Sequence, residues 1–143
     1  MNKLEKTMNK SILLCDDEPH ILRAAEYKFR RSGFDVRCAY DGEDGWNQIQ
    51  ERVPDIVVTD CQMPRLDGLG LAKRVLDDRE LNLPVLMLSA KGFELSPDEL
   101  EREYGVLALL AKPFSPRELQ RLVEQILETG RATQIVAHPA LDI

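Results

Sequence analysis

The sequence lacks a long apolar run. Its longest strongly apolar stretches are residues 12–15, 56–58 and 106–111, far short of the roughly 20 residues that a helix needs to span a bilayer. Residues 1–10 contain lysines, but the four apolar residues that follow are too few for the core of a signal peptide. We therefore expect no membrane insertion and a cytoplasmic location.

Cysteine and histidine are also scarce. Cys15, Cys38 and Cys61 are widely spaced without a Cys-x-x-Cys pair, and His20 and His138 are the two histidines. This supply of soft ligands does not suit a zinc site. Cys15 and Cys38 lie in apolar stretches, where a free thiol acts as a small hydrophobic side chain. We expect both to fill the core.

An excess of basic residues is missing as well. The chain has 19 Lys and Arg against 25 Asp and Glu, a formal net charge of -6, whereas proteins that neutralise phosphate backbones usually carry a basic face. Nucleic acid is therefore not expected as a direct partner. With 143 residues, of which 43% are hydrophobic, the chain fits one ordinary globular domain.

What the sequence does contain is a regular alternation of short apolar runs and segments of helical period. This succession predicts an α/β fold with a parallel sheet and helices on both faces. The continuous apolar run 56–58 predicts a central strand that is buried on both sides. We expect strands at residues 11–15, 34–39, 56–60, 85–88 and 106–111. Helices are expected near 21–32, 41–51 and 68–78, then a short helix from 97, and a last helix from 116 to the residue before Gly130.

Several helix ends and faces can be predicted from local sequence. Ser96 and Ser115 each precede a proline and stand three residues before a glutamate, the pattern of a capping box. The helix that begins after Ser96 has few inward residues, Leu100 and Tyr104, which predicts low local stability. The third helix is expected to bury one face, made by Leu69, Ala72, Val75 and Leu76.

The chain is expected to divide into three parts. We expect residues 1–10 to form a polar leader and residues 11–128 to form the folded domain. Gly130 ends the last helix, and residues 129–143 show no clear period. We interpret that last part as a tail.

Polar residues stand where four of the expected strands end. In an open α/β sheet the reactive crevice lies beyond the carboxyl ends of the strands, where the strand order reverses. We therefore expect five polar residues to lie together at the carboxyl edge of the sheet. They are Asp16 and Asp17 after the first strand, Asp60 at the end of the third, Ser89 after the fourth and Lys112 after the fifth.

Clustered carboxylates repel one another and need a counter-charge. Mg²⁺ suits them, because it prefers hard oxygen ligands and is commonly held by one or two carboxylates together with phosphate oxygens. With the ion bound, one carboxylate can attack a phosphoryl donor and form an aspartyl phosphate. Asp60 is the best candidate, since Lys112 offers charge neutralisation and Ser89 a hydroxyl donor.

Four motifs carry a family resemblance. In chain order they are LLCDDEP at 13–19, DCQMPRLDG at 60–68, SAK at 89–91 and KPF at 112–114. Together the motifs resemble the full series of response-regulator receiver domains, over residues 11 to about 128. Their order and their places at strand ends make the resemblance specific.

The resemblance implies a doubly wound five-stranded sheet in the flavodoxin-like order 2-1-3-4-5. It implies a phosphoacceptor of two-component or phosphorelay signalling that assists its own phosphorylation and dephosphorylation, rather than an enzyme. A histidine kinase or histidine phosphotransfer protein would donate the phosphoryl group from a phosphohistidine. Output would pass through protein contacts to a downstream effector or a second copy of the chain, because no DNA-binding output domain is expected after Gly130.

Site roles also follow from the resemblance. Asp60 would accept the phosphoryl group, and Ser89 and Lys112 would bind its oxygens. A peptide bond in the cis form, plausible only before proline, would link Lys112 to Pro113. The expected Mg²⁺ ligands are Asp17 directly, Asp16 mainly through water, the Asp60 carboxylate and the backbone carbonyl of Gln62.

One position departs from the family. Leu109 stands three residues before Lys112, where receiver domains commonly carry Tyr or Phe. We hypothesise that the switch face, formed by the fourth helix, fifth strand and fifth helix, still responds with smaller amplitude or by another route. Gln62 and Lys91, two residues after the acceptor and the hydroxyl residue, are expected to tune the lifetime of the phosphate.

Two other functions use the same features. A Mg²⁺-dependent phosphohydrolase with an aspartyl nucleophile would usually carry an acid two residues after it, where this chain has Gln62. A pseudo-receiver would keep the fold as a binding module without phosphorylation, but the acidic set is complete. The receiver interpretation is therefore favoured.

Overall fold

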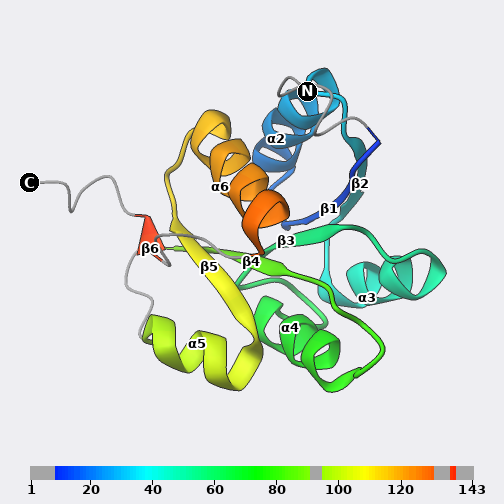
Figure 1. Ribbon diagram of the computed structural model, residues 1–143. Helices are drawn as coiled ribbons and strands as arrows, with labels where there is room; N and C mark the ends of the chain where they lie inside the picture. Colours follow the sequence, from blue (N-terminus) through cyan, green and yellow to red (C-terminus); the bar gives the residue numbers. More distant parts are fainter. Residues whose placement is uncertain (1–8, 91–94, 131–135, 138–143) are drawn as a thin grey trace, which may run out of the picture.

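The computed structural model describes residues 9–90, 95–130 and, for their backbone, 136–137. Strands and helices alternate along the chain (Figure 1). Their bounds are β1 Ser11–Cys15, α2 Pro19–Arg31, β2 Asp35–Ala39, α3 Gly42–Glu51, β3 Ile56–Asp60, α4 Gly68–Asp77, β4 Val85–Ser89, α5 Pro97–Tyr104, β5 Val106–Ala111, α6 Pro116–Thr129 and β6 Val136–Ala137.

All strand pairs of the sheet are parallel, and the strand order is β2-β1-β3-β4-β5-β6. The predicted five-stranded order 2-1-3-4-5 is confirmed. The sixth strand is an addition, because it lies within the segment 129–143 that the sequence predicts as a tail. It pairs Val136 with Leu109 and Ala137 with Leu110, so it covers part of the outer edge of β5.

Helices cover both faces of the sheet, with α2 and α6 on one side and α3, α4 and α5 on the other (Figure 1). Because side chains alternate along a strand, β1 supplies both layers. Ile12 and Leu14 pack in the layer that contains Phe29 of α2 and Val123 of α6. Fully burying a side chain of this size contributes roughly 1.5–3 kcal/mol.

The opposite layer contains Leu13 and Cys15 of β1, together with Ile49 of α3, Leu71 of α4 and Leu100 of α5. The strands β3 and β4 are buried at every position. The prediction of a central strand without polar alternation is thus confirmed, and the Cys15 thiol fills the core as expected.

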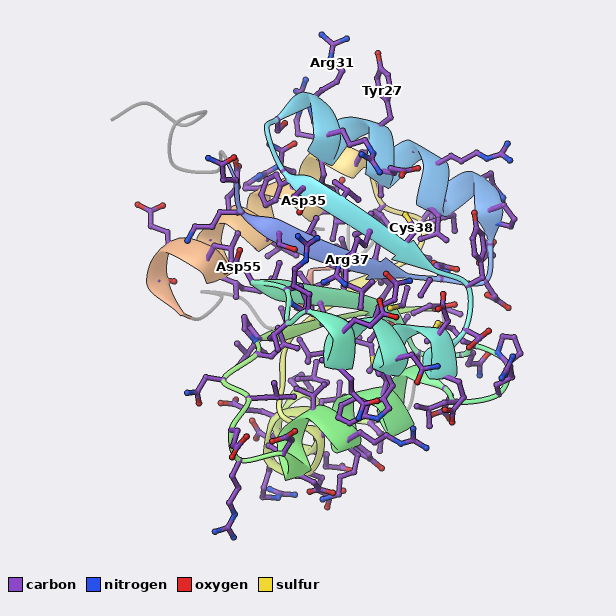
Figure 2. All side chains as sticks on the ribbon, turned by 90° about the vertical axis from the view of Figure 1, so that its right-hand side faces the viewer. Tyr27, Arg31, Asp35, Arg37, Cys38 and Asp55 are labelled. Atoms are coloured by element: carbon purple, nitrogen blue, oxygen red, sulfur yellow. The ribbon has the colours of Figure 1, made fainter. Side chains whose placement is uncertain are left out.

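The strand β2 forms the edge opposite β6. It carries Asp35, whose carboxylate pairs with Arg52 at 3.0 Å, and Arg37 (Figure 2). The guanidinium of Arg37 donates hydrogen bonds to the carbonyl oxygens of Gln48 (2.9 Å) and Arg52 (2.6 Å), at the end of α3. Charged side chains on an edge strand discourage pairing with another chain.

The helix starts follow the predicted caps. The side chains of Ser96 and Ser115 accept hydrogen bonds from the backbone N–H groups of Glu99 and Glu118. Asp67 caps α4 in the same way, accepting from Gly70 N at 2.7 Å. In the part of the chain that the structure describes, no helix combines the length and hydropathy needed to cross a membrane.

One predicted face is wrong in part. Leu76 was expected to point inward from α4, but it is 43% exposed. The buried stripe of α4 is instead centred on Leu71, Ala72 and Val75. Leu76 follows Val75 by one residue, a rotation of about 100° on a helix with 3.6 residues per turn, and this rotation carries its side chain to the border of the apolar face.

The start of α4 packs directly on the loop that follows β3. A Cβ atom added to Gly68 would overlap the backbone oxygen of Asp60, a contact that no side-chain movement can relieve. Gly68→Ala is therefore expected to lower the free energy of unfolding by about 1–3 kcal/mol, the usual cost of overpacking. Urea denaturation measures this loss.

Gly70→Ala is the matched control on the same helix. Its added Cβ first meets the Cδ1 end of the Leu66 side chain, which can rotate away, and alanine favours the helix. We expect its loss to be less than half of that for Gly68→Ala. Equal losses would contradict the close-packing explanation.

Candidate acidic site at the carboxyl edge of the sheet

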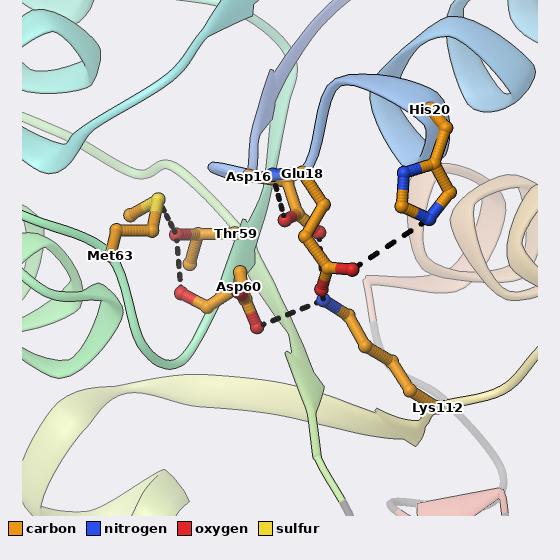
Figure 3. A network of polar contacts seen from close by, with 7 residues as sticks. All are labelled: Asp16, Glu18, His20, Thr59, Asp60, Met63 and Lys112. Carbon is orange, nitrogen blue, oxygen red and sulfur yellow. Dashed lines mark hydrogen bonds and ion pairs between the residues drawn. The ribbon is translucent and has the colours of Figure 1, made fainter.

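The predicted site residues meet at the carboxyl ends of the strands. Asp16 follows β1, Asp60 ends β3, Ser89 ends β4 and Lys112 follows β5. The strand order reverses between β1 and β3, which is where an open sheet leaves a crevice. Figure 3 shows Asp16, Asp60 and Lys112 converging there from three separate elements.

The ammonium group of Lys112 lies among three carboxylates. Its Nζ is 2.9 Å from Glu18 Oε1, 3.0 Å from Asp16 Oδ2 and 3.4 Å from Asp60 Oδ1 (Figure 3). The side chains of Lys112, Asp16 and Asp60 are largely buried. Three anions thus share one cation in a site with limited access to water.

Four carboxylates gather close enough to share a metal ion. Asp16, Asp17, Glu18 and Asp60 each offer an oxygen, and these oxygens all lie within 4.8 Å of one another. The buried Oδ2 of Asp16 is in ion-pair contact with Lys112 but accepts no hydrogen bond of good geometry. A buried carboxylate oxygen with an open lone pair suits a hard cation such as Mg²⁺.

Backbone groups fix the acidic residues in place. Glu18 N donates a hydrogen bond to Asp16 Oδ1 at 3.0 Å, which turns Oδ2 toward Lys112. Lys112 N donates to the carbonyl oxygen of Ser89 at 2.8 Å, so the end of β5 is tied to the end of β4. Ser89 is itself buried.

Burial and mutual repulsion shift the protonation of this site. Burial, followed by the charge of Asp16, raises the pKa of Asp60 from 3.8 to about 6, although Lys112 opposes the shift. Burial also raises the pKa of Asp16. A carboxyl group with a raised pKa is poorly compensated in its charged form, which indicates that the site favours an additional cation.

Lys112 and Glu18 stabilise each other's charged forms. Burial alone would lower the pKa of Lys112, but its hydrogen bond to Glu18, its ion pair with Asp16 and the nearby charge of Asp60 raise it. The hydrogen bond from Lys112 is the main reason that the pKa of Glu18 is lowered. At neutral pH the site therefore holds a charged lysine and a charged glutamate.

The remaining predicted residues have different surroundings. Asp17 is exposed at the mouth of the site, and Gln62 is exposed two residues after Asp60. The Lys112–Pro113 peptide bond is cis, as the family resemblance implies. Leu109 is buried in the layer that contains Leu100 and Tyr104 of α5. Lys91 lies outside the described residues.

Sequence reasoning did not assign Glu18 to the site. In the structure its carboxylate accepts a hydrogen bond from Lys112, 94 residues away in sequence. Glu18 is the N-cap residue of α2, yet its side chain makes no cap hydrogen bond. The following Pro19 favours an extended backbone at Glu18, which is the one local signal that the side chain could point away from the helix.

Thr59 and Met63 also went unassigned. The Thr59 hydroxyl contacts the carbonyl oxygen of Asp60 at 3.0 Å and the sulfur of Met63 at 3.9 Å (Figure 3). Gly68 N donates to the carbonyl oxygen of Cys61 at 2.8 Å. These contacts connect the end of β3 with the loop that follows it, and no sequence pattern predicts them.

Comparison with known proteins points to one family. The family model described as the response regulator receiver domain matches residues 12–124. The chain is 41% identical over 130 residues to the alkaline phosphatase synthesis transcriptional regulatory protein PhoP of Bacillus subtilis, which covers 91% of this chain and 52% of that protein. It is 40% identical over 111 residues to the response regulator GtcR of Aneurinibacillus migulanus, with 78% and 45% covered. The chain thus spans about half the length of these curated relatives.

Solved structures agree with this result. The receiver domain of the Francisella response regulator 1452 superposes with a TM-score of 0.75 at 31% identity, covering 86% of this chain and 100% of that one. The receiver domain of NtrX from Brucella abortus gives a TM-score of 0.74 at 31% identity, covering 82% and 98%. Both neighbours share the fold over nearly their whole length.

The raised pKa of Asp60 predicts a pH-dependent stability change. This carboxyl group has a pKa of about 6 in the folded chain and an ordinary pKa of 3.8. Folding therefore increases its affinity for the proton. The ionised form therefore costs stability above pH 6, and the cost disappears below the ordinary pKa. With a chelator present, Asp60→Asn should raise the free energy of unfolding at pH 8 by about 2–3 kcal/mol.

Urea denaturation of both proteins between pH 4 and 8 measures this difference. Asp77→Asn is the control, since it removes an exposed carboxylate whose ion pair with Lys73 is worth at most about 1 kcal/mol. A stabilisation by Asp60→Asn that is equally large at pH 4 and pH 8 would contradict the electrostatic explanation.

Proposed function

Because the chain belongs to the response regulator receiver domains, we propose that it accepts a phosphoryl group on Asp60 in two-component or phosphorelay signalling. The donor would be a phosphohistidine of a histidine kinase or histidine phosphotransfer protein. The observation that carries the proposal is the placement of Asp60 at the end of β3, 3.4 Å from Lys112 and among three further carboxylates.

The proposed reaction needs an ionised Asp60. Its carboxylate oxygen attacks phosphorus, the bond from phosphorus to the donor nitrogen breaks, and the imidazole leaves with the bonding electrons. Lys112 neutralises charge on the phosphoryl oxygens. Ser89, whose backbone oxygen is bonded to Lys112 N, would contribute its hydroxyl as a donor to the same oxygens.

The acidic residues would hold Mg²⁺. The proposed ligands are Asp17 and the Asp60 carboxylate, Asp16 mainly through water, and the backbone carbonyl of Gln62. When bound, the ion neutralises negative charge on the carboxylates and on the phosphoryl oxygens. Lys112 and the N–H of Glu18 orient Asp16, so this ligand is positioned before any ion arrives.

Output is proposed to pass through protein contacts in the cytoplasm, to a downstream effector or a second copy of the chain, and without direct contact to nucleic acid. The switch face would consist of α5, β5 and α6. Leu109 of β5 is already buried against Leu100 of α5. A leucine cannot swing a large ring between two positions, so we propose a response of smaller amplitude.

Phosphorylation can be tested directly. Incubation with acetyl phosphate and Mg²⁺ should add one phosphoryl group to the chain, and Asp60→Asn should abolish the addition because it removes the nucleophile. Mass spectrometry of the intact protein and of its peptides measures the adduct and its position. A mass gain that survives Asp60→Asn would place the acceptor elsewhere, and the absence of any adduct on the unaltered chain would contradict the proposal.

Metal binding can be tested separately. Asp17→Asn should weaken Mg²⁺ binding at least tenfold, because it removes an exposed carboxylate of the cluster without removing a contact of Lys112. Glu43→Gln is the control, since Glu43 is not a member of the cluster and pairs with Arg74. Isothermal titration calorimetry measures both affinities, and equal Mg²⁺ affinity in the two variants would exclude Asp17 as a ligand.

A further inference from the structure

Of the three carboxylates around Lys112, one has no assigned role. Asp60 is the proposed acceptor and Asp16 a proposed metal ligand, but Glu18 is neither. Its contact with Lys112 is the shortest of the three, at 2.9 Å. The Glu18 side chain makes no hydrogen bond that caps a helix. Its hydrogen bond within the site is the one that it accepts from Lys112.

Glu18 stands on the open side of the site. Its side chain is 44% exposed, whereas that of Asp16 is 1% exposed. Glu18 and Lys112 both border a cavity of about 510 Å³ that Ile21 of α2 and Phe114 also line. Glu18 and Lys112 thus border this cavity, and Lys112 also contacts the buried carboxylates of Asp16 and Asp60.

This position places Glu18 in competition with a phosphoryl group. A phosphoryl group carries its own negative charge, and to be neutralised at Asp60 it must attract the ammonium that Glu18 now holds. His20 does not replace Lys112 as the partner, because its Nε2 lies 3.7 Å from Glu18 Oε2 and its side chain is 79% exposed. An incoming phosphoryl group therefore meets both the negative charge of Glu18 and an ammonium that is already engaged.

We propose that Glu18 is a positioning residue that restrains phosphorylation, as a counter-ion that the incoming phosphoryl group must displace from Lys112. The inference rests on the proposed function of Asp60. Glu18 touches no reacting atom and acts through Lys112. It sets how readily a donor engages the site, whereas the transfer to Asp60 itself depends on the carboxylate, the ion and Lys112.

Glu18→Gln tests this role, because glutamine keeps the size of the side chain and removes the charge. With saturating Mg²⁺ and increasing acetyl phosphate, the donor concentration for half-maximal rate should fall about threefold to fivefold, the range of a partly exposed ion pair. The maximal rate should stay within about twofold. High salt should shrink the difference, because it screens exposed charges.

Glu26→Gln is the matched control. It removes the same charge from the same helix, but Glu26 pairs with Arg30 and not with Lys112. A second measurement, made without metal or donor, is the ¹⁵N chemical shift of the Lys112 ammonium group. This shift should change in Glu18→Gln and stay unchanged in Glu26→Gln. Both variants should retain the thermal stability of the unaltered chain within a few degrees.

Three outcomes would overturn the inference. One is an unchanged or higher half-maximal donor concentration in Glu18→Gln, and another is an equal fall in Glu26→Gln. The third is a loss of more than tenfold in Mg²⁺ affinity, which would make Glu18 a metal ligand. If the unaltered chain takes up no phosphoryl group, the proposed function fails; if it does and Glu18→Gln behaves identically, this inference alone fails.

Discussion

The sharing of one ammonium group among several buried or half-buried carboxylates is the constraint on which the acidic site depends. Removing Lys112 would leave Asp16 and Asp60 without their nearest described cation, and an uncompensated buried charge is strongly destabilising. Even with Lys112 present the compensation is incomplete, as the raised pKa of Asp60 indicates. The carboxylates that could share a metal ion surround Asp60 itself, so the proposed cation site and the proposed phosphoryl acceptor occupy the same place.

The fold provides this arrangement through its topology. A parallel sheet brings the carboxyl ends of all its strands to one edge, and the reversal between β1 and β3 opens a crevice beside Asp60. The start of α4 packs closely on the end of β3, because Gly68 lies against the backbone of Asp60 and the Thr59 hydroxyl contacts the same carbonyl. These contacts help to position Asp60, whose carboxylate lies close to Lys112.

Much of this could be predicted from sequence, for a physical reason. Strand ends are marked by the change from buried apolar residues to polar ones. The sequence therefore predicts that four residues lie at the same edge of the sheet: Asp16, Asp60, Ser89 and Lys112. The contact between Glu18 and Lys112 could not be predicted, because it depends on a side-chain direction across 94 residues. The strand β6 has two residues, too few for any periodicity, and Leu76 lies at the border of a helix face where one residue decides exposure.

The structure also indicates which helix can move at a small cost in free energy when Asp60 changes. Across the sheet Asp60 pairs with Leu88, and Leu88 pairs with Leu110 of β5, so one line of neighbouring backbone segments joins the acceptor to β5. The helix that packs against β5 in the layer of Leu109 is α5, which buries one residue, Leu100. The helices α2, α4 and α6 each bury at least three apolar residues. Because apolar burial is the main term that holds a helix to a sheet, displacing α5 sacrifices less of it than displacing any of these three. A small rearrangement near Asp60 therefore has a path to the surface that does not require a swinging aromatic ring at the position of Leu109.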